Sequence, residues 1–135
     1  MTMNVQDATF IQTKALPAAG ASAATDPIDT GARTARGDFL ADVEFQLAVP
    51  ATPNLADTKT ITYSIETDDD VAFGSAKVVN AGLVVSTGAG GAGAAAVDER
   101  FRLPTNVERY VRVKATVEAA GGDNTGVSMT FKALF

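Results

Sequence analysis

The chain has 135 residues, enough for one domain with its own hydrophobic core, and 46% of them are apolar. It contains no cysteine, which excludes disulfides and thiolate metal sites, and no histidine, the side chain that most often transfers protons near neutral pH. No stretch is long and apolar enough for a membrane helix, and the first residues lack the pattern of a secretory signal. We therefore expect a soluble protein that is used without export and is not an enzyme.

The net charge of −5 is distributed unevenly along the sequence. Residues 1–99 carry 13 acidic and 5 basic side chains, whereas residues 100–135 carry 3 acidic and 6 basic ones. The overall acidity disfavours nonspecific binding of nucleic acid, which depends on clustered positive charge. An acidic and a basic face could instead orient contacts between copies, although a solvated mixed surface also explains the pattern.

The first 22 residues are expected to form an extended N-terminal arm (1–22) ahead of a β-sandwich domain (23–135). Residues 15–22 are small, are interrupted by proline and glycine and show no periodicity, which is typical of loosely held chain. The one possible helix, residues 5–14, has a poor apolar stripe. Three apolar side chains of the arm need cover, and we interpret them as partner-binding residues, with docking onto their own domain as the alternative: Phe10, Ile11 and Leu16.

Four segments alternate between apolar and polar residues, the pattern of strands with one buried face. They are residues 42–49, 60–66, 110–117 and 127–135. The predicted inward-facing residues are Val43, Phe45, Leu47 and Val49; Ile61, Tyr63 and Ile65; Val111, Val113, Ala115 and Val117; and Val127, Met129, Phe131, Ala133 and Phe135.

Weaker strand candidates lie between these segments, and turn-forming residues separate them. The weaker candidates are residues 24–29, 77–80, 82–87 and 96–103, and the turns are 50–54, 68–70, 80–82 and 120–124. About eight short strands without a convincing helix predict an all-β fold. We expect an antiparallel two-sheet β-sandwich or jelly roll.

A glycine- and alanine-rich stretch, residues 88–96, invites comparison with phosphate-binding loops. It lacks the Gly-Lys-Ser/Thr ending that contacts phosphate and Mg²⁺. We interpret it as a mobile loop whose small residues would also let another subunit approach closely.

Two groups of carboxylates are candidate sites. Asp68, Asp69 and Asp70 are hard oxygen donors suited to Ca²⁺, but consecutive side chains on an extended chain point in different directions, which favours a solvated hairpin turn. Asp98 and Glu99 precede Arg100 and Arg102, and a cross-strand or surface ion pair explains them. They could also suit glycoside hydrolysis, but the chain has no tryptophan on which a sugar would stack. We assign no catalytic residue, no cofactor and no metal.

Three cations cluster on one predicted strand: Arg109, Arg112 and Lys114, beside Tyr110. With one aromatic residue among them, they make a thin nucleic-acid patch. Charge on the solvent side of an edge strand, which blocks unwanted sheet pairing, is one interpretation. A docking patch for an acidic partner subunit is the other.

Several segments together resemble the cement, or decoration, proteins that coat the heads of short-tailed bacteriophages. The likeness extends from about Pro17 to Phe135. The segments that carry it are Asp57–Ile65, Leu103–Pro104, Arg109–Val113, Ala119–Gly126 and Leu134–Phe135.

The resemblance implies a jelly-roll sandwich that forms a homotrimer on the outer surface of the virion capsid. There it would stabilise contacts between subunits of the major capsid protein, with neither nucleic acid nor membrane as a partner. A ligand- or carbohydrate-binding sandwich is the alternative, as a receptor-binding module or a tail or fibre component. The low aromatic content, 7%, weighs against sugar binding.

Overall fold

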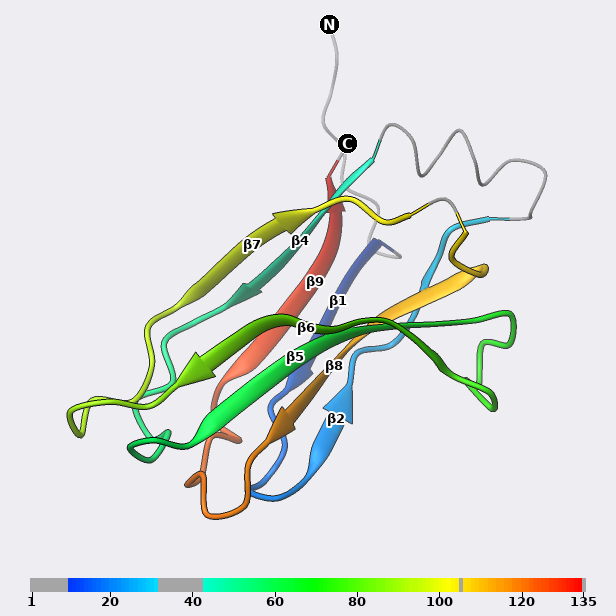
Figure 1. Cartoon of the computed structure of the whole chain (residues 1–135). Helices are drawn as coiled ribbons and strands as arrows, with labels where there is room; N and C mark the ends of the chain where they lie inside the picture. The colour runs from blue at the N-terminus through cyan, green and yellow to red at the C-terminus, as the bar shows by residue number, and fades with distance from the viewer. Residues whose placement is uncertain (1–9, 32–42, 105, 135) are drawn as a thin grey trace, which may run out of the picture.

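The computed structural model describes residues 10–31, 43–104 and 106–134, which form two antiparallel sheets packed face to face (Figure 1). One sheet has the strand order β1-β9-β4-β7 and the other β2-β8-β5-β6, with β3 also pairing with β8. The strands are β1 (Ile11–Ala15), β2 (Ser22–Ala24), β3 (Ile28–Asp29), β4 (Glu44–Val49), β5 (Thr60–Asp68), β6 (Lys77–Thr87), β7 (Val97–Phe101), β8 (Tyr110–Val117) and β9 (Ser128–Leu134).

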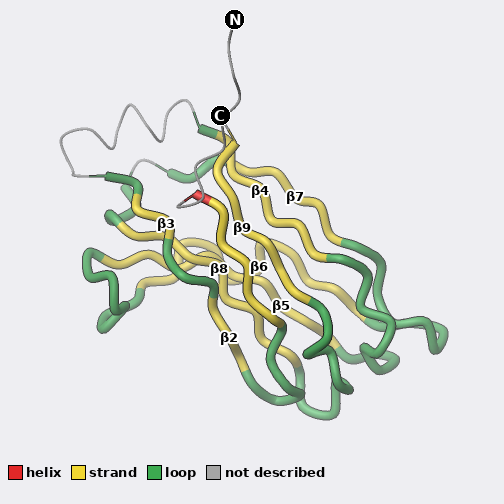
Figure 2. Tube along the Cα trace, turned by 180° about the vertical axis from the view of Figure 1, so that it is seen from behind, coloured by secondary structure: helices red, strands yellow, loops and turns green. Residues whose placement is uncertain are grey.

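This arrangement confirms the predicted all-β sandwich. Consecutive strands alternate between the two sheets, as in a jelly roll, with two exceptions: the β5–β6 hairpin, and the short strands β2 and β3, which both belong to the second sheet. Figure 2 shows β2 and β3 one after the other along β8, so together they fill a single strand position. No helix in the described residues is long and apolar enough to span a membrane.

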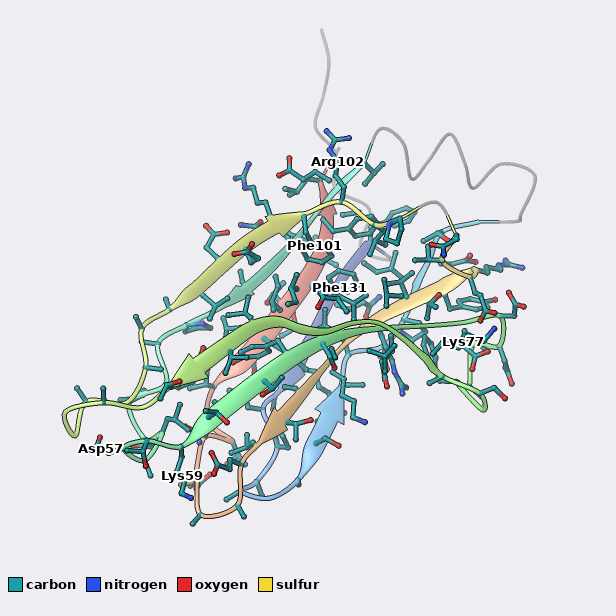
Figure 3. The ribbon with its side chains drawn as sticks, viewed as in Figure 1. Asp57, Lys59, Lys77, Phe101, Arg102 and Phe131 are labelled. Atoms are coloured by element: carbon teal, nitrogen blue, oxygen red, sulfur yellow. The ribbon has the colours of Figure 1, made fainter. Side chains whose placement is uncertain are left out.

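The four strands predicted from alternation form β4, β5, β8 and β9, and they supply most of the core. Their predicted inward side chains are buried, except for Val127, which is half-buried, and Phe135, which lies outside the described residues. Figure 3 shows the rings of Phe101 and Phe131 between the two sheets, where they stack with Phe45. Burial of these apolar faces is the main driving force for the fold.

Residues 10–22 lie within the sandwich rather than in an arm. Ile11–Ala15 pairs with Lys132–Ser128 of β9, where the sequence allowed the end of a helix. Leu16 is 2% exposed, and its backbone N–H donates to Val127 O at 2.8 Å. Residues 1–9, the rest of the expected arm, lie outside the described residues.

β6 is a single strand of 11 residues, where the sequence predicted two short strands and a turn. Its register against β5 shifts between Tyr63 and Ile65 and again at Glu66. The turn-forming Asn80 accepts a hydrogen bond from Gly82 N at 3.1 Å, and the result is a bulge rather than a reversal of the chain.

The glycine-rich loop, interpreted from the sequence as mobile, makes hydrogen bonds to a distant segment of the chain. Thr52 and Ala94 exchange two backbone hydrogen bonds of 3.0 and 3.1 Å. Gly91 N donates to the carboxylate of Asp57 at 2.8 Å. These bonds join residues 88–96 to the loop before β5 at the left-hand end of the sandwich, where Figure 3 labels Asp57.

Tyr63 is fully buried, and its hydroxyl has no hydrogen-bond partner among the described residues. Burial raises the pKa of Tyr63 to about 12. We expect Tyr63→Phe to increase the free energy of unfolding by about 1 kcal/mol, because a buried unpaired hydroxyl is removed. Urea unfolding of both proteins at one protein concentration measures the difference.

The same substitution should change the alkaline limit of stability. The folded state favours the neutral form of Tyr63. The stability that depends on this neutral form is fully present below the ordinary tyrosine pKa of about 10, and it is lost as the pH rises towards about 12. Tyr63→Phe should remove this loss. With two tyrosines and no tryptophan in the chain, the tyrosinate absorbance of a Tyr110→Phe variant reports Tyr63 alone. Ionisation of Tyr63 near pH 10 in the folded variant would contradict the expectation.

Candidate contact surface on the second sheet

The predicted cation cluster lies on an interior strand. β8 pairs with β2 and β3 on one side and with β5 on the other, so the edge-strand interpretation is wrong. Because Val111, Val113 and Ala115 point into the core, Arg112 and Lys114 point outward from the second sheet. The structure therefore puts two of the three predicted cations on one outer face.

Glu66 lies beneath these two cations. It is opposite Arg112 in the β5–β8 register, and the guanidinium binds one of its oxygens at 2.9 Å. Lys114 Nζ lies 3.9 Å from the other oxygen. The Glu66 side chain is 8% exposed, whereas those of Arg112 and Lys114 are 24% and 38% exposed. The charge presented to solvent at this place is therefore mainly positive.

Arg112 is held from a second side by the hairpin between β5 and β6. Its guanidinium lies over the ring of Phe73 at 4.1 Å from the centroid. This cation–π contact fixes the planar group between an aromatic face and a carboxylate. The hairpin thus covers the Arg112 end of the face, while Lys114 remains more exposed.

Arg109 has a different role. Its Nε and Nη2 donate to the two oxygens of Asp29 at 2.9 and 2.8 Å, which connects β3 to the start of β8. These hydrogen bonds hold the pKa of Asp29 below its usual range. The predicted cluster is therefore divided between a pair that supports the fold and a pair on the outer face.

The apolar part of this face was not predicted from the sequence. Val78 and Val85 are 59% and 54% exposed, and in register they lie beside Glu66 and Thr62. The signal was present in two Val-Val pairs, because neighbouring residues of a strand point to opposite faces and one valine of each pair must point outward. A shallow hollow of about 340 Å³ adjoins Val78, and its lining includes Ser64, Glu66, Val78, Ala81, Lys114 and Thr116.

The three aspartates at the end of β5 form the predicted hairpin turn. Asp68 is buried and accepts hydrogen bonds from Asp70 N at 3.0 Å and Ser75 N at 2.8 Å, which hold its pKa below the usual value. Asp69 and Asp70 are exposed, and the next residue, Val71, is 57% exposed. No group of three or more possible metal ligands occurs in the described part of the chain.

Comparison with models of protein families shows the family to which the chain belongs. The model of one family, Bbp16, matches residues 10–130, from the residue before β1 into β9. The chain belongs to the Bbp16 family. The match indicates a phage-type domain that covers nearly the whole sandwich. A search of curated proteins finds no match.

The apolar residues predicted to bind partners are distributed differently in this Bbp16-family protein. Leu16 is buried in its own domain, which was the alternative interpretation. Phe10 is half-buried and packs against the core. Ile11 is half-buried and pairs in register with Lys132 on the first sheet. A role in partner binding remains a prediction for Phe10 and Ile11.

Proposed function

We propose that this Bbp16-family protein is a capsid cement protein. It binds the outer surface of a phage head as a homotrimer and stabilises contacts between subunits of the major capsid protein. The observation that carries the proposal is the match to a phage-type family over residues 10–130. The jelly roll supports it, because this fold recurs among viral capsid domains.

The contacts at the two ends of the domain suit such a role. At one end, backbone hydrogen bonds join the three loops around Thr52, Gly88 and Gly121. At the other end, Arg109–Asp29 and Lys77–Glu108 ion pairs connect neighbouring elements. A block that does not deform transmits load between the capsid subunits that it bridges. Several copies joined in one trimer also bind together, so modest individual contacts add up to tight attachment.

The test uses phage heads that lack the protein. Purified protein is added to expanded heads and to unexpanded precursors, and bound protein is measured after sedimentation. We expect saturable binding to the expanded heads and a higher temperature for release of their DNA. Immunogold labelling of whole particles locates the protein. Label on the tail, or no binding to either form of head, would contradict the cement role.

A further inference from the structure

We infer that two copies of this protein bind through unlike surfaces: the β5–β6 hairpin tip of one copy sits on the outer face of the second sheet of another. The tip is Asp69, Asp70 and Val71. The acceptor face comprises Val78, Ala81, Lys114 and Thr116 around the 340 Å³ hollow, with Val85 farther along β6. The inference rests on the proposed function, because it specifies the contact between copies that the proposed trimer requires.

The charges of the two surfaces are complementary. Lys114 is 38% exposed and its anionic partner Glu66 only 8%, so the acceptor face presents positive charge on a protein whose net charge is −5. The tip presents the two exposed carboxylates of Asp69 and Asp70. Opposite potentials orient two surfaces as they approach and disfavour wrong pairings.

The exposed apolar side chains also lie on the hairpin tip and on the acceptor face. Val71, Val78 and Val85 are the large hydrophobic residues that stand out to solvent in the described part of the chain, at 57%, 59% and 54% exposure. One belongs to the tip and two to the acceptor strand. A contact between copies would remove them from water together, and the hollow beside Val78 offers room for the Val71 side chain.

The contact fits a second copy better than the same molecule. Within one chain, the hairpin already rests on the face through Phe73 and Arg112, and Val71 is still exposed. A contact between unlike surfaces leaves each copy with one tip and one face to offer. Such contacts close into a ring when the rotation between copies permits, and a three-membered ring is the trimer of the proposed function.

Engineered cysteines test the contact directly, because the chain has none of its own. A Val71→Cys chain is mixed with an Ala81→Cys chain and oxidised. We expect a disulfide between the two kinds of chain in large excess over Val71→Cys homodimers. The control replaces the acceptor with Ala89→Cys, an exposed position in the glycine-rich loop at the far end of the sandwich. Equal yields of all three products would overturn the inference.

Neutralising the tip gives a second, independent measurement. The double variant Asp69→Asn and Asp70→Asn should self-associate about tenfold more weakly in sedimentation. Added salt should also weaken self-association of the unmodified protein. The amide oxygen introduced at position 70 can still accept the hydrogen bond from Ala72 N that Asp70 accepts at 3.0 Å. The matched control neutralises two exposed acids elsewhere, with Asp26→Asn and Glu99→Gln. Equal association of both double variants would contradict the inference.

These experiments contain no phage heads, so they separate the two conclusions. A protein that is monomeric at every concentration overturns both the contact between copies and the homotrimer, and binding to heads is then decided by its own test. A protein that assembles as inferred and binds no head supports the contact and contradicts the cement role.

Discussion

Replacing Gly88 by alanine is expected to lower the free energy of unfolding by about 3 kcal/mol, because the added methyl group has no space. A Cβ at Gly88 would lie 2.2 Å from Ala56 O and 2.7 Å from Leu55 O. Both neighbours are backbone atoms of the loop before β5, so they cannot move aside as a flexible side chain would. The midpoint of urea unfolding, measured at a fixed protein concentration, should fall accordingly.

Gly126→Ala is the matched control. Neither glycine has a positive φ, so alanine is free of backbone strain at both positions, and a Cβ at Gly126 would meet no atom within 4 Å. We expect Gly126→Ala to leave stability unchanged or to raise it by about 0.5 kcal/mol, through the smaller entropy of the unfolded chain. If both variants unfold at the same urea concentration, the close approach at Gly88 does not stabilise the protein.

This glycine shows why the loop could not be predicted. A stretch of glycine and alanine is compatible with a mobile loop and equally with a loop packed against another backbone. Gly93 also packs closely against another backbone, because a Cβ at this position would lie 1.9 Å from Thr52 O. The contacting segments are far apart in the sequence, and the composition of one segment does not determine which backbone packs against it.

Strands with one face buried in the core were predictable from the sequence, and edge strands were less predictable. In β4, β5, β8 and β9 the core fixes every second side chain, so alternation identifies them. β1 and β6 lie at the edges of their sheets, where fewer side chains are forced inward. In β6 a bulge also shifts the alternation, which divided one strand into two predicted pieces.

The candidate contact surface was half predictable for a related reason. Arg112 and Lys114 stand two residues apart on a clearly alternating strand, so their shared outer face follows from the sequence. Their partner Glu66 is on β5, 46 positions before Arg112, and β6 and β7 lie between the two strands in the sequence. Its place opposite Arg112 depends on the register of β5 against β8, and pairing across a sheet is a tertiary property. The two cations were therefore predictable from the sequence, and the carboxylate that reduces their net charge was not.

Phe131→Ala is expected to cause the largest loss of stability, about 4 kcal/mol. Phe131 is fully buried and contacts two other rings, with centroids 5.6 Å from Phe45 and 6.1 Å from Phe101. Truncation would remove the apolar burial of one ring and both stacking contacts, and would leave a cavity between the sheets. Urea unfolding again measures the change, and a loss below about 2 kcal/mol would mean that the core closes around the cavity.

Phe101→Ala gives the matched comparison within the same three-ring stack. Phe101 is on the edge strand β7 and is only half-buried, although its ring also stacks with two others, at 6.1 Å from both Phe45 and Phe131. If ring contacts dominated, the two substitutions would cost the same. Because water already reaches Phe101 and can fill the space that its ring leaves, we expect its truncation to cost about half as much as that of Phe131. The ratio of the two losses therefore measures how much of the stability of this core comes from exclusion of water rather than from stacking.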